Sequence, residues 1–234
     1  MSVKIRLSKD RGHADYGWLN TYHTFSFADY YDPQYMGFRA MRVLNDDVIG
    51  PGRGFDAHPH KDMEIISYVV EGELAHKDSM GNGSVIKAGN LQRMTAGTGV
   101  RHSEFNPSAK NKARLLQIWI LPDKKGLNPS YQEITVDQLS PKDGLTLVAS
   151  FDGKDNVIKV HQDIYLYRGK LGKGGQANYS AQKGRGLWFQ MVKGKALLNG
   201  QYSLEEGDGA AIEDEKKIIV SAPKEAEFLL FDLG

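Results

Sequence analysis

The chain contains no cysteine. This absence excludes disulfide bonds, thiolate metal sites and cysteine nucleophiles together. Long apolar runs are also missing, because no stretch approaches the ~20 apolar residues that a membrane-spanning helix needs. Lys4 and Arg6 place charge where a signal peptide would carry an apolar run. We therefore expect a cytoplasmic protein without a membrane anchor, whose reactive side chains must be His, Asp, Glu, Lys, Tyr or Ser.

The sequence also lacks an excess of either charge. Lys and Arg number 30 and Asp and Glu number 29, which gives a net charge of +1. A protein that grips nucleic acid through a large basic surface would be more positive, so no direct nucleic-acid binding is expected. The 234 residues suffice for one or two domains. We expect a monomer, although no sequence feature decides the oligomeric state.

Sustained helical periodicity is a further feature that is missing. Instead, 26 glycines separate short runs that are rich in β-branched and aromatic residues, such as residues 64–70 and 113–121. Turn signals recur every ~8–12 residues, which is typical of a β-sandwich or barrel. The sequence therefore predicts an all-β fold.

Similar segments recur in the two halves of the chain. The run that ends at Gly72 resembles the run that ends at Gly194, an offset of 122 residues. The run around Gly89 resembles the run around Gly207, an offset of 118 residues. Two offsets this close indicate two copies of one β unit with slightly different loops.

The boundary between the copies is expected where turn-forming residues interrupt the strand pattern. Residues 122–126 and 140–144 each combine proline, glycine and charged residues. We therefore predict an N-terminal domain over residues 1–122 and a C-terminal domain over residues 123–234, with the linker region at about residues 122–150.

Two short segments combine residues that can bind a metal. In His58-Pro59-His60, residues i and i+2 of an extended backbone point to the same face, and the proline favours an extended conformation at His58. The same spacing places His102 beside Glu104. If two neighbouring strands carry these segments, three histidines and one carboxylate can meet at one point.

The chemistry of these residues narrows the choice of metal. Three neutral nitrogens and one anionic oxygen suit Fe, Mn, Co, Ni or Cu better than Ca or Mg, which prefer oxygen ligands. Spacing alone leaves two alternatives open. Glu64 has the same parity as His58 and His60 and could replace Glu104 as a ligand, and a His-x-His pair in a β protein can also be a surface pair. His13, His23 and His76 could lie around the metal ligands, but positions at the surface or in hydrogen bonds are expected for them.

Longer motifs around these residues resemble a known superfamily. Gly52-x5-His58-x-His60-x3-Glu64-x7-Gly72 is similar to the first cupin motif, and the segment from Gly89 to Asn106 is similar to the second, with Thr95 where proline is common and two extra residues before His102. More narrowly, the chain resembles the pirin family. The blocks that carry this resemblance lie between about residues 13 and 122 and comprise residues 24–33, 42–47, 58–64, 78–82 and 92–106.

The resemblance implies a bicupin, in which two cupin-type β-barrels form one chain. It further implies a metal site in the N-terminal barrel, with His58, His60, His102 and Glu104 as ligands and Glu64 as a non-ligand. Iron is the metal usually assigned to the family, and we expect Fe(II), with Mn, Ni, Co or Cu as alternatives. The C-terminal barrel should lack a matching site, because the positions equivalent to the three histidines are Ser180, Gln182 and Val220.

The resemblance also implies an activity, because quercetin 2,3-dioxygenase is the activity associated with bacterial pirin-like proteins. We therefore expect a metal-dependent dioxygenase that takes a flavonol and dioxygen and releases carbon monoxide, with Glu104 as the carboxylate that removes the 3-hydroxyl proton. Four aromatic residues could either form the pocket wall or belong to the core, namely Phe25, Phe27, Phe38 and Phe55. The alternative is an iron-binding, non-catalytic regulatory module that acts on a protein partner.

Overall fold

Strands make up nearly all of the regular structure. The computed structural model describes residues 2–215 and 217–234. Within them the only helical segments are two short 3-10 turns, η1 (Ser8–Asp10) and η2 (Val136–Gln138). In that part of the chain no helix is long and apolar enough to cross a membrane. The prediction of an all-β fold is confirmed.

The described residues form two compact units. The N-terminal unit comprises Gly12–Asp137 together with Val160–Gln162, and the C-terminal unit comprises Ser2–Arg11, Gln138–Lys159 and Asp163–Gly234. The units differ from the predicted domains in three segments. Residues 123–137 lie in the predicted linker region and join the N-terminal unit, where β12 (Ser130–Ile134) pairs with β9 (Leu91–Thr95). The other two segments are shorter, and their contacts explain their placement.

The first exchanged segment is the N-terminal strand β1 (Ser2–Arg6). It pairs antiparallel with β19 (Gly209–Glu213), and its Val3 and Ile5 pack against the apolar core of the C-terminal unit. The second segment surrounds His161, whose backbone oxygen accepts a hydrogen bond from the amide of Asp123 at 2.7 Å. Long-range pairing decides both placements, and neither segment carries a sequence pattern that reveals its partner.

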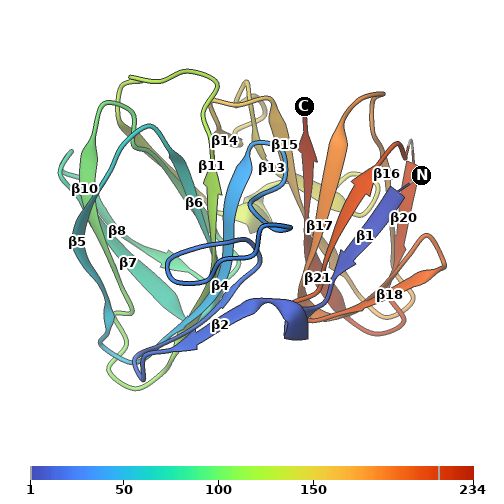
Figure 1. The fold of residues 1–234 in the computed structure, drawn as a ribbon, viewed down its shortest axis with the longest axis horizontal. Helices are drawn as coiled ribbons and strands as arrows, with labels where there is room; N and C mark the ends of the chain where they lie inside the picture. Colours follow the sequence, from blue (N-terminus) through green and yellow to red (C-terminus); the bar gives the residue numbers. More distant parts are fainter. Residues whose placement is uncertain (1, 216) are drawn as a thin grey trace. The chain divides into compact units, whose positions relative to one another are not determined.

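Two antiparallel sheets build the N-terminal unit, and the four-stranded sheet faces strands of the seven-stranded sheet (Figure 1). In sheet order, the seven-stranded sheet contains β12 (Ser130–Ile134), β9 (Leu91–Thr95), β6 (Glu64–Glu71), β11 (Ala113–Ile120), β4 (Met41–Ile49), β3 (Leu19–His23) and β2 (Gly12–Asp15). The four-stranded sheet contains β5 (Gly54–His60), β10 (Val100–Phe105), β7 (Glu73–Asp78) and β8 (Gly83–Lys87). Side chains that point between the two sheets therefore come from distant parts of the sequence.

One ten-stranded sheet builds the C-terminal unit. Its main path runs through β1, β19, β17 (Gly186–Leu198), β21 (Ala226–Leu233), β15 (Ile164–Leu171), β13 (Leu145–Ser150) and β14 (Ile158–Lys159), and its other strands are β16 (Gln176–Ser180), β18 (Tyr202–Glu205) and β20 (Lys217–Ser221). The interior is a continuous apolar cluster that includes Phe189, Phe228 and Val220. Val220, the position equivalent to His102, thus belongs to that core.

Two glycines confirm that the units repeat one plan. Gly72 has a φ of +72° and lies against Lys112 and Ala113, where β11 begins. Gly194 has a φ of +76° and lies against Glu225 and Ala226, where β21 begins. The two residues that the sequence repeat aligns therefore occupy the same place in the two units.

Candidate metal centre

Three histidines of the four-stranded sheet converge between the sheets of the N-terminal unit. His58 and His60 are two residues apart on β5 and point to the same face, and His102 on β10 pairs directly with His58. The three ring centroids are 4.6, 4.7 and 4.9 Å apart. One ring nitrogen of each lies within 4.8 Å of the others. The structure thus brings together all three histidines that the sequence predicted as ligands.

The hydrogen bonds of these histidines leave nitrogen lone pairs available. The Nδ1 atom of His58 lies 2.7 Å from the backbone oxygen of Asp56 and donates to it, which leaves Nε2 as an acceptor. His102 is only 2% exposed, and neither of its ring nitrogens has a hydrogen-bond partner among the described residues. Buried polar atoms normally have partners. A metal ion among the three rings would supply one, so the residues fit the implied metal.

The protonation state of the histidines favours the same role. Burial, with the nearby rings of His102 and His58, lowers the pKa of His60 to about 4. Burial, with the nearby rings of His58 and His76, lowers the pKa of His102 to about 3. Both imidazoles are therefore neutral at pH 7, which is the form that binds metals.

Glu104 follows His102 by two residues on β10, is fully buried, and accepts three hydrogen bonds. Its Oε1 atom accepts from the hydroxyl of Ser67 at 2.8 Å and from the amide of Gln92 at 2.7 Å. Its Oε2 atom accepts from the amide of Gln117 at 2.9 Å. A carboxylate offers about four lone-pair sites, so Glu104 can still bind a metal or a proton.

The three donors form a polar row across the seven-stranded sheet. Gln92 on β9 pairs with Ser67 on β6, Ser67 pairs with Gln117 on β11, and Gln117 pairs with Asn45 on β4. Residues opposite each other in adjacent strands share one face, so all four side chains point toward the four-stranded sheet. The row therefore holds the carboxylate of Glu104 in one orientation.

Glu104 approaches the histidine cluster on the side of His102. Ligand atoms of His76, His102 and Glu104 lie within 4.8 Å of one another, whereas Glu104 does not share such a set with His58 and His60. His76 is buried, its Nε2 atom lies 3.2 Å from Asp78 Oδ2, and its ring stacks on Tyr131 with centroids 4.6 Å apart. A fourth histidine thus lies next to the predicted ligands, in a hydrogen-bonded position.

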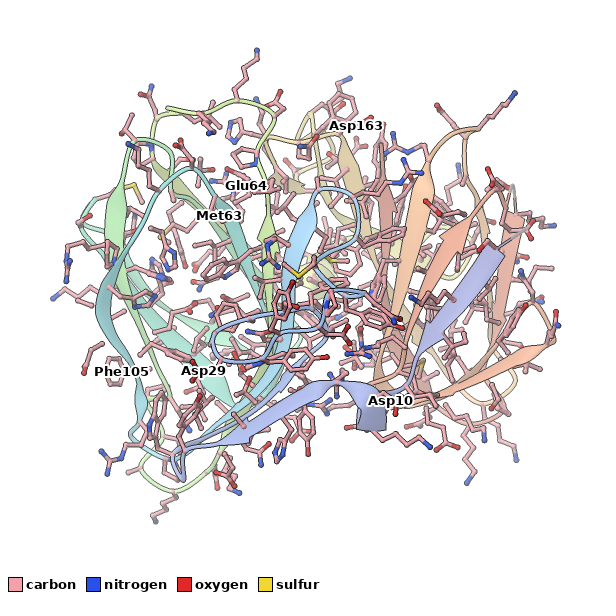
Figure 2. All side chains as sticks on the ribbon, in the orientation of Figure 1. Asp10, Asp29, Met63, Glu64, Phe105 and Asp163 are labelled. Atoms are coloured by element: carbon pink, nitrogen blue, oxygen red, sulfur yellow. The ribbon has the colours of Figure 1, made fainter. Side chains whose placement is uncertain are left out.

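Glu64, the alternative ligand left open by spacing, lies elsewhere. Figure 2 shows Glu64 at the start of β6, next to Met63. Its carboxylate is fully buried, 3.9 Å from the guanidinium of Arg93 and 3.4 Å from Nδ1 of His161. It joins neither cluster of metal-binding residues. This placement agrees with the non-ligand role that the family resemblance implies.

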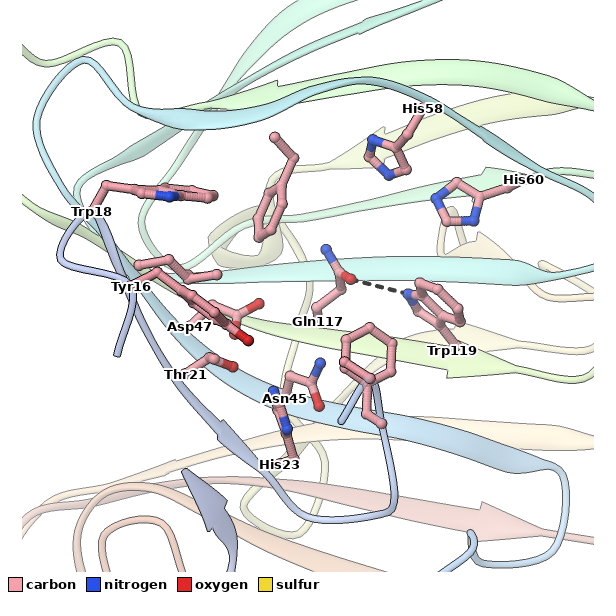
Figure 3. A pocket seen from close by; sticks show the side chains of 14 residues that line it. Tyr16, Trp18, Thr21, His23, Asn45, Asp47, His58, His60, Gln117 and Trp119 are labelled. Atoms are coloured by element: carbon pink, nitrogen blue, oxygen red, sulfur yellow. Dashed lines mark hydrogen bonds between the residues drawn. The ribbon is translucent and has the colours of Figure 1, made fainter. Parts of the chain in front are cut away.

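A cavity of about 390 Å³ opens beside His58 and His60 (Figure 3). Its apolar and aromatic lining comprises Tyr16, Trp18, Leu19, Phe27, Ala28, Phe55 and Trp119. Of the four candidate wall residues, Phe27 and Phe55 line this cavity, whereas Phe25 is a core residue and Phe38 is not part of the wall. Gln117 reaches the cavity and links Trp119, whose indole N–H donates to it at 3.1 Å, to Glu104. The cavity can bind a flat aromatic molecule.

Sequence reasoning did not identify Ser67, Gln92 or Gln117 as parts of the site. A usable signal was present for two of them, because Ser67 and Gln117 interrupt apolar strands at positions that face the interior. A polar residue in such a position must find a buried partner. The identity of that partner depends on strand pairing, which the sequence does not reveal.

Comparisons with known proteins give the family. Residues 4–120 match the family model described as pirin, and residues 147–233 match the model described as the quercetinase C-terminal cupin domain. A protein from Escherichia coli named quercetin 2,3-dioxygenase is 49% identical over 231 residues, which cover 99% of this chain and 98% of the relative. The chain belongs to the pirin family.

Solved pirin structures share the fold. The crystal structure of YhhW from Escherichia coli has a TM-score of 0.94 at 48% identity, and the match covers 100% of this chain and 98% of that one. The crystal structure of the bacterial pirin YhhW in complex with nickel(II) has a TM-score of 0.93 at 48% identity, with 99% of each chain covered. The predicted family and the predicted bicupin fold of this pirin are therefore confirmed.

Proposed function

We propose that this pirin is a metal-dependent dioxygenase that opens the central ring of a flavonol and releases carbon monoxide. The observation that carries the proposal is the position of the three histidines, which lie close enough to share one metal ion while two of them, His58 and His60, line an aromatic cavity. The likeness to a protein named quercetin 2,3-dioxygenase supports the choice of a flavonol as the substrate.

His58, His60, His102 and Glu104 would hold the metal in this proposal. Fe(II) is the first choice, and Ni, Mn, Co and Cu fit the same ligands. A bound ion would act as a Lewis acid that lowers the pKa of the flavonol 3-hydroxyl. The described donors of Gln92, Ser67 and Gln117 keep the Glu104 carboxylate in position next to His102.

The protein side chains then have three tasks. Trp18, Phe55 and Trp119 stack against the flat rings and exclude water from the cavity. Glu104 accepts the proton of the 3-hydroxyl as a general base, since its carboxylate lies within 4.8 Å of a ring nitrogen of His102. In the overall reaction both atoms of dioxygen enter the ring-opened product, and the carbon that carried the 3-hydroxyl leaves as carbon monoxide.

The test is the release of carbon monoxide from quercetin in air by the protein loaded with Fe(II) under anaerobic conditions. Wild type should release it catalytically, and His102→Ala should not. His13→Ala is the control, because His13 stacks on Tyr22 and belongs to neither metal-binding cluster. A wild-type protein that holds its metal but releases no carbon monoxide would contradict the proposal and favour the regulatory alternative.

A further inference from the structure

The cavity has a polar side opposite the histidines. Among its lining residues, Thr21 lies on β3, and Asn45 and Asp47 lie on β4. Figure 3 shows these three side chains across the cavity from His58 and His60. Each is at most 3% exposed. An aromatic cavity with buried polar groups across from His58 and His60 is suited to a molecule with polar groups at both ends.

The strand register explains why these side chains meet. Asn45 and Asp47 are two residues apart on β4 and therefore point to the same face. Thr21 pairs directly with Asp47. Asn45 also pairs with Gln117, so it extends the row of polar side chains that holds Glu104. Two neighbouring strands therefore fix this polar group, and no flexible loop contributes to it.

Within the described residues the side-chain oxygen of Asn45 lacks a hydrogen-bond partner, and Asp47 lacks an ion pair. The Oδ1 atom of Asn45 is buried and has no hydrogen-bond partner within the described residues. In that part of the chain no lysine or arginine forms an ion pair with Asp47, whereas the neighbouring Asp46 accepts two hydrogen bonds from Arg114, at 2.8 and 3.0 Å. Buried acceptors without partners destabilise a protein by ~1–3 kcal/mol each, so donors on a ligand would bind here favourably.

We propose that Asn45 and Asp47 form a specificity site that accepts hydrogen bonds from phenolic hydroxyls on the substrate ring that lies farthest from the metal-binding hydroxyl. This inference rests on the proposed function and narrows its substrate class. The preferred substrate is a polyhydroxylated flavonol, and a flavonol whose outer rings carry no hydroxyl leaves the Asn45 oxygen buried without a partner and adds no donor to Asp47.

The test measures binding without turnover. Trp18 and Trp119 line the cavity, so quenching of tryptophan fluorescence reports occupancy. Protein loaded with Ni(II) is titrated without oxygen with quercetin and with 3-hydroxyflavone, which keeps the 3-hydroxyl and lacks the others. Wild type should bind quercetin more tightly. At pH 8, where the Asp47 carboxylate is charged, the ratio of the two affinities should fall by ~10-fold or more in Asp47→Asn, the size expected for a hydrogen bond to a charged group.

Two further variants and one kinetic measurement complete the design. Asp47→Leu should reduce the ratio at least as far, and Asp46→Asn is the matched control, because Asp46 is bound by Arg114 and does not line the cavity. In aerobic turnover, Asp47→Asn should raise KM for quercetin more than it lowers kcat.

The outcomes separate this inference from the proposed function. Equal losses for both flavonols, or an unchanged ratio, would overturn the specificity site, and wild type that still released carbon monoxide would then retain its proposed activity. If metal-loaded wild type bound neither flavonol, both proposals would be overturned together.

Discussion

At the scale of single residues, the N-terminal unit concentrates buried polar groups around one carboxylate and one imidazole. Glu104 accepts three hydrogen bonds from side chains, and His102 has two nitrogens without a partner among the described residues. Burial of polar groups is unfavourable unless partners are supplied. The protein supplies them for Glu104, and we expect a metal ion to supply one for His102.

The first prediction concerns the orientation of Glu104. Gln92→Leu removes one donor to Oε1 while keeping a similar volume. Loss of an outer hydrogen bond at a metal site typically reduces activity or metal affinity ~10–100-fold, and we expect a loss of this size in kcat/KM. Gln132→Leu on the neighbouring strand β12 is the control, because the Gln132 oxygen accepts a hydrogen bond from Arg93 and the three described donors to Glu104 are other residues. Equal activity of Gln92→Leu and wild type would contradict the assigned role.

The second prediction concerns Asp47 and pH. Burial, with the nearby carboxylates of Asp46 and Glu104, raises the pKa of Asp47 to about 7, above its ordinary value of 3.8. The folded state therefore binds more protons than the unfolded state between these values, and stability falls as pH rises from about 4 to about 7.

Asp47→Asn removes the fall in stability that ionisation of Asp47 causes. Because one pKa unit corresponds to about 1.4 kcal/mol, the variant should have a free energy of unfolding ~1–4 kcal/mol higher than wild type at pH 8 and a nearly equal one at pH 4. Urea unfolding of the metal-free protein at both pH values measures the difference. Asp46→Asn should instead destabilise at pH 8, since it loses the ion pair with Arg114. A less stable Asp47→Asn at pH 8 would show that the carboxylate is satisfied in the fold.

At the scale of elements, strand alternation made part of the site predictable. The i, i+2 spacing placed His58 with His60, and His102 with Glu104, on common faces, and the structure has β5 beside β10. The donors to Glu104 were not predictable in the same way. Ser67, Gln92 and Gln117 lie 37, 12 and 13 residues from Glu104 in the sequence, and only the register of β6, β9 and β11 brings them together.

The third prediction concerns Gly72 and Gly194, which pack against the first residues of the equivalent strands β11 and β21. A Cβ at Gly72 would lie 2.8 Å from the backbone oxygen of Lys112, and one at Gly194 would overlap the backbone oxygen of Glu225. Alanine at either position would also have to adopt a left-handed backbone conformation, which lowers the stability of the folded protein by ~1–2 kcal/mol. Gly52→Ala is the control, because its φ is +61° but no atom lies within 4 Å.

Thermal or urea unfolding should rank the three variants. Gly52→Ala should lower the free energy of unfolding only by the cost of the left-handed conformation. Gly72→Ala and Gly194→Ala should lower it further, because the neighbouring backbone must also shift. If Gly72→Ala and Gly194→Ala lost no more stability than Gly52→Ala, this result would contradict the close packing of Gly72 and Gly194 against the starts of β11 and β21.

At the scale of the whole molecule, one β unit occurs twice in the chain, and the side chains that fill its interior differ between the two copies. The repeat and the turn-rich region near residue 122 indicated two β units. The placement of β1, of β12 and of the segment around His161 was not predictable, because it depends on pairing between distant residues. The C-terminal unit fills its interior with apolar side chains, and the N-terminal unit retains the histidines.

The fourth prediction follows from this difference. The protein should bind one transition-metal ion per chain, and His60→Ala should weaken binding by at least ~10–100-fold, since outer-shell losses alone have that effect. Metal analysis after equilibration at a fixed free-metal concentration gives the stoichiometry, with His13→Ala as the control. Two ions per wild-type chain, or full occupancy in His60→Ala, would contradict a single site at the three histidines.

The most direct test of the central claim follows the oxygen atoms. Metal-loaded wild type should convert quercetin under isotopically labelled dioxygen into a ring-opened product that carries both labelled atoms, with one unlabelled carbon monoxide released per flavonol consumed. Mass spectrometry of the product and the gas phase measures both quantities. A product without label, or quercetin consumption that yields hydrogen peroxide and no carbon monoxide, would contradict a dioxygenase at this metal centre.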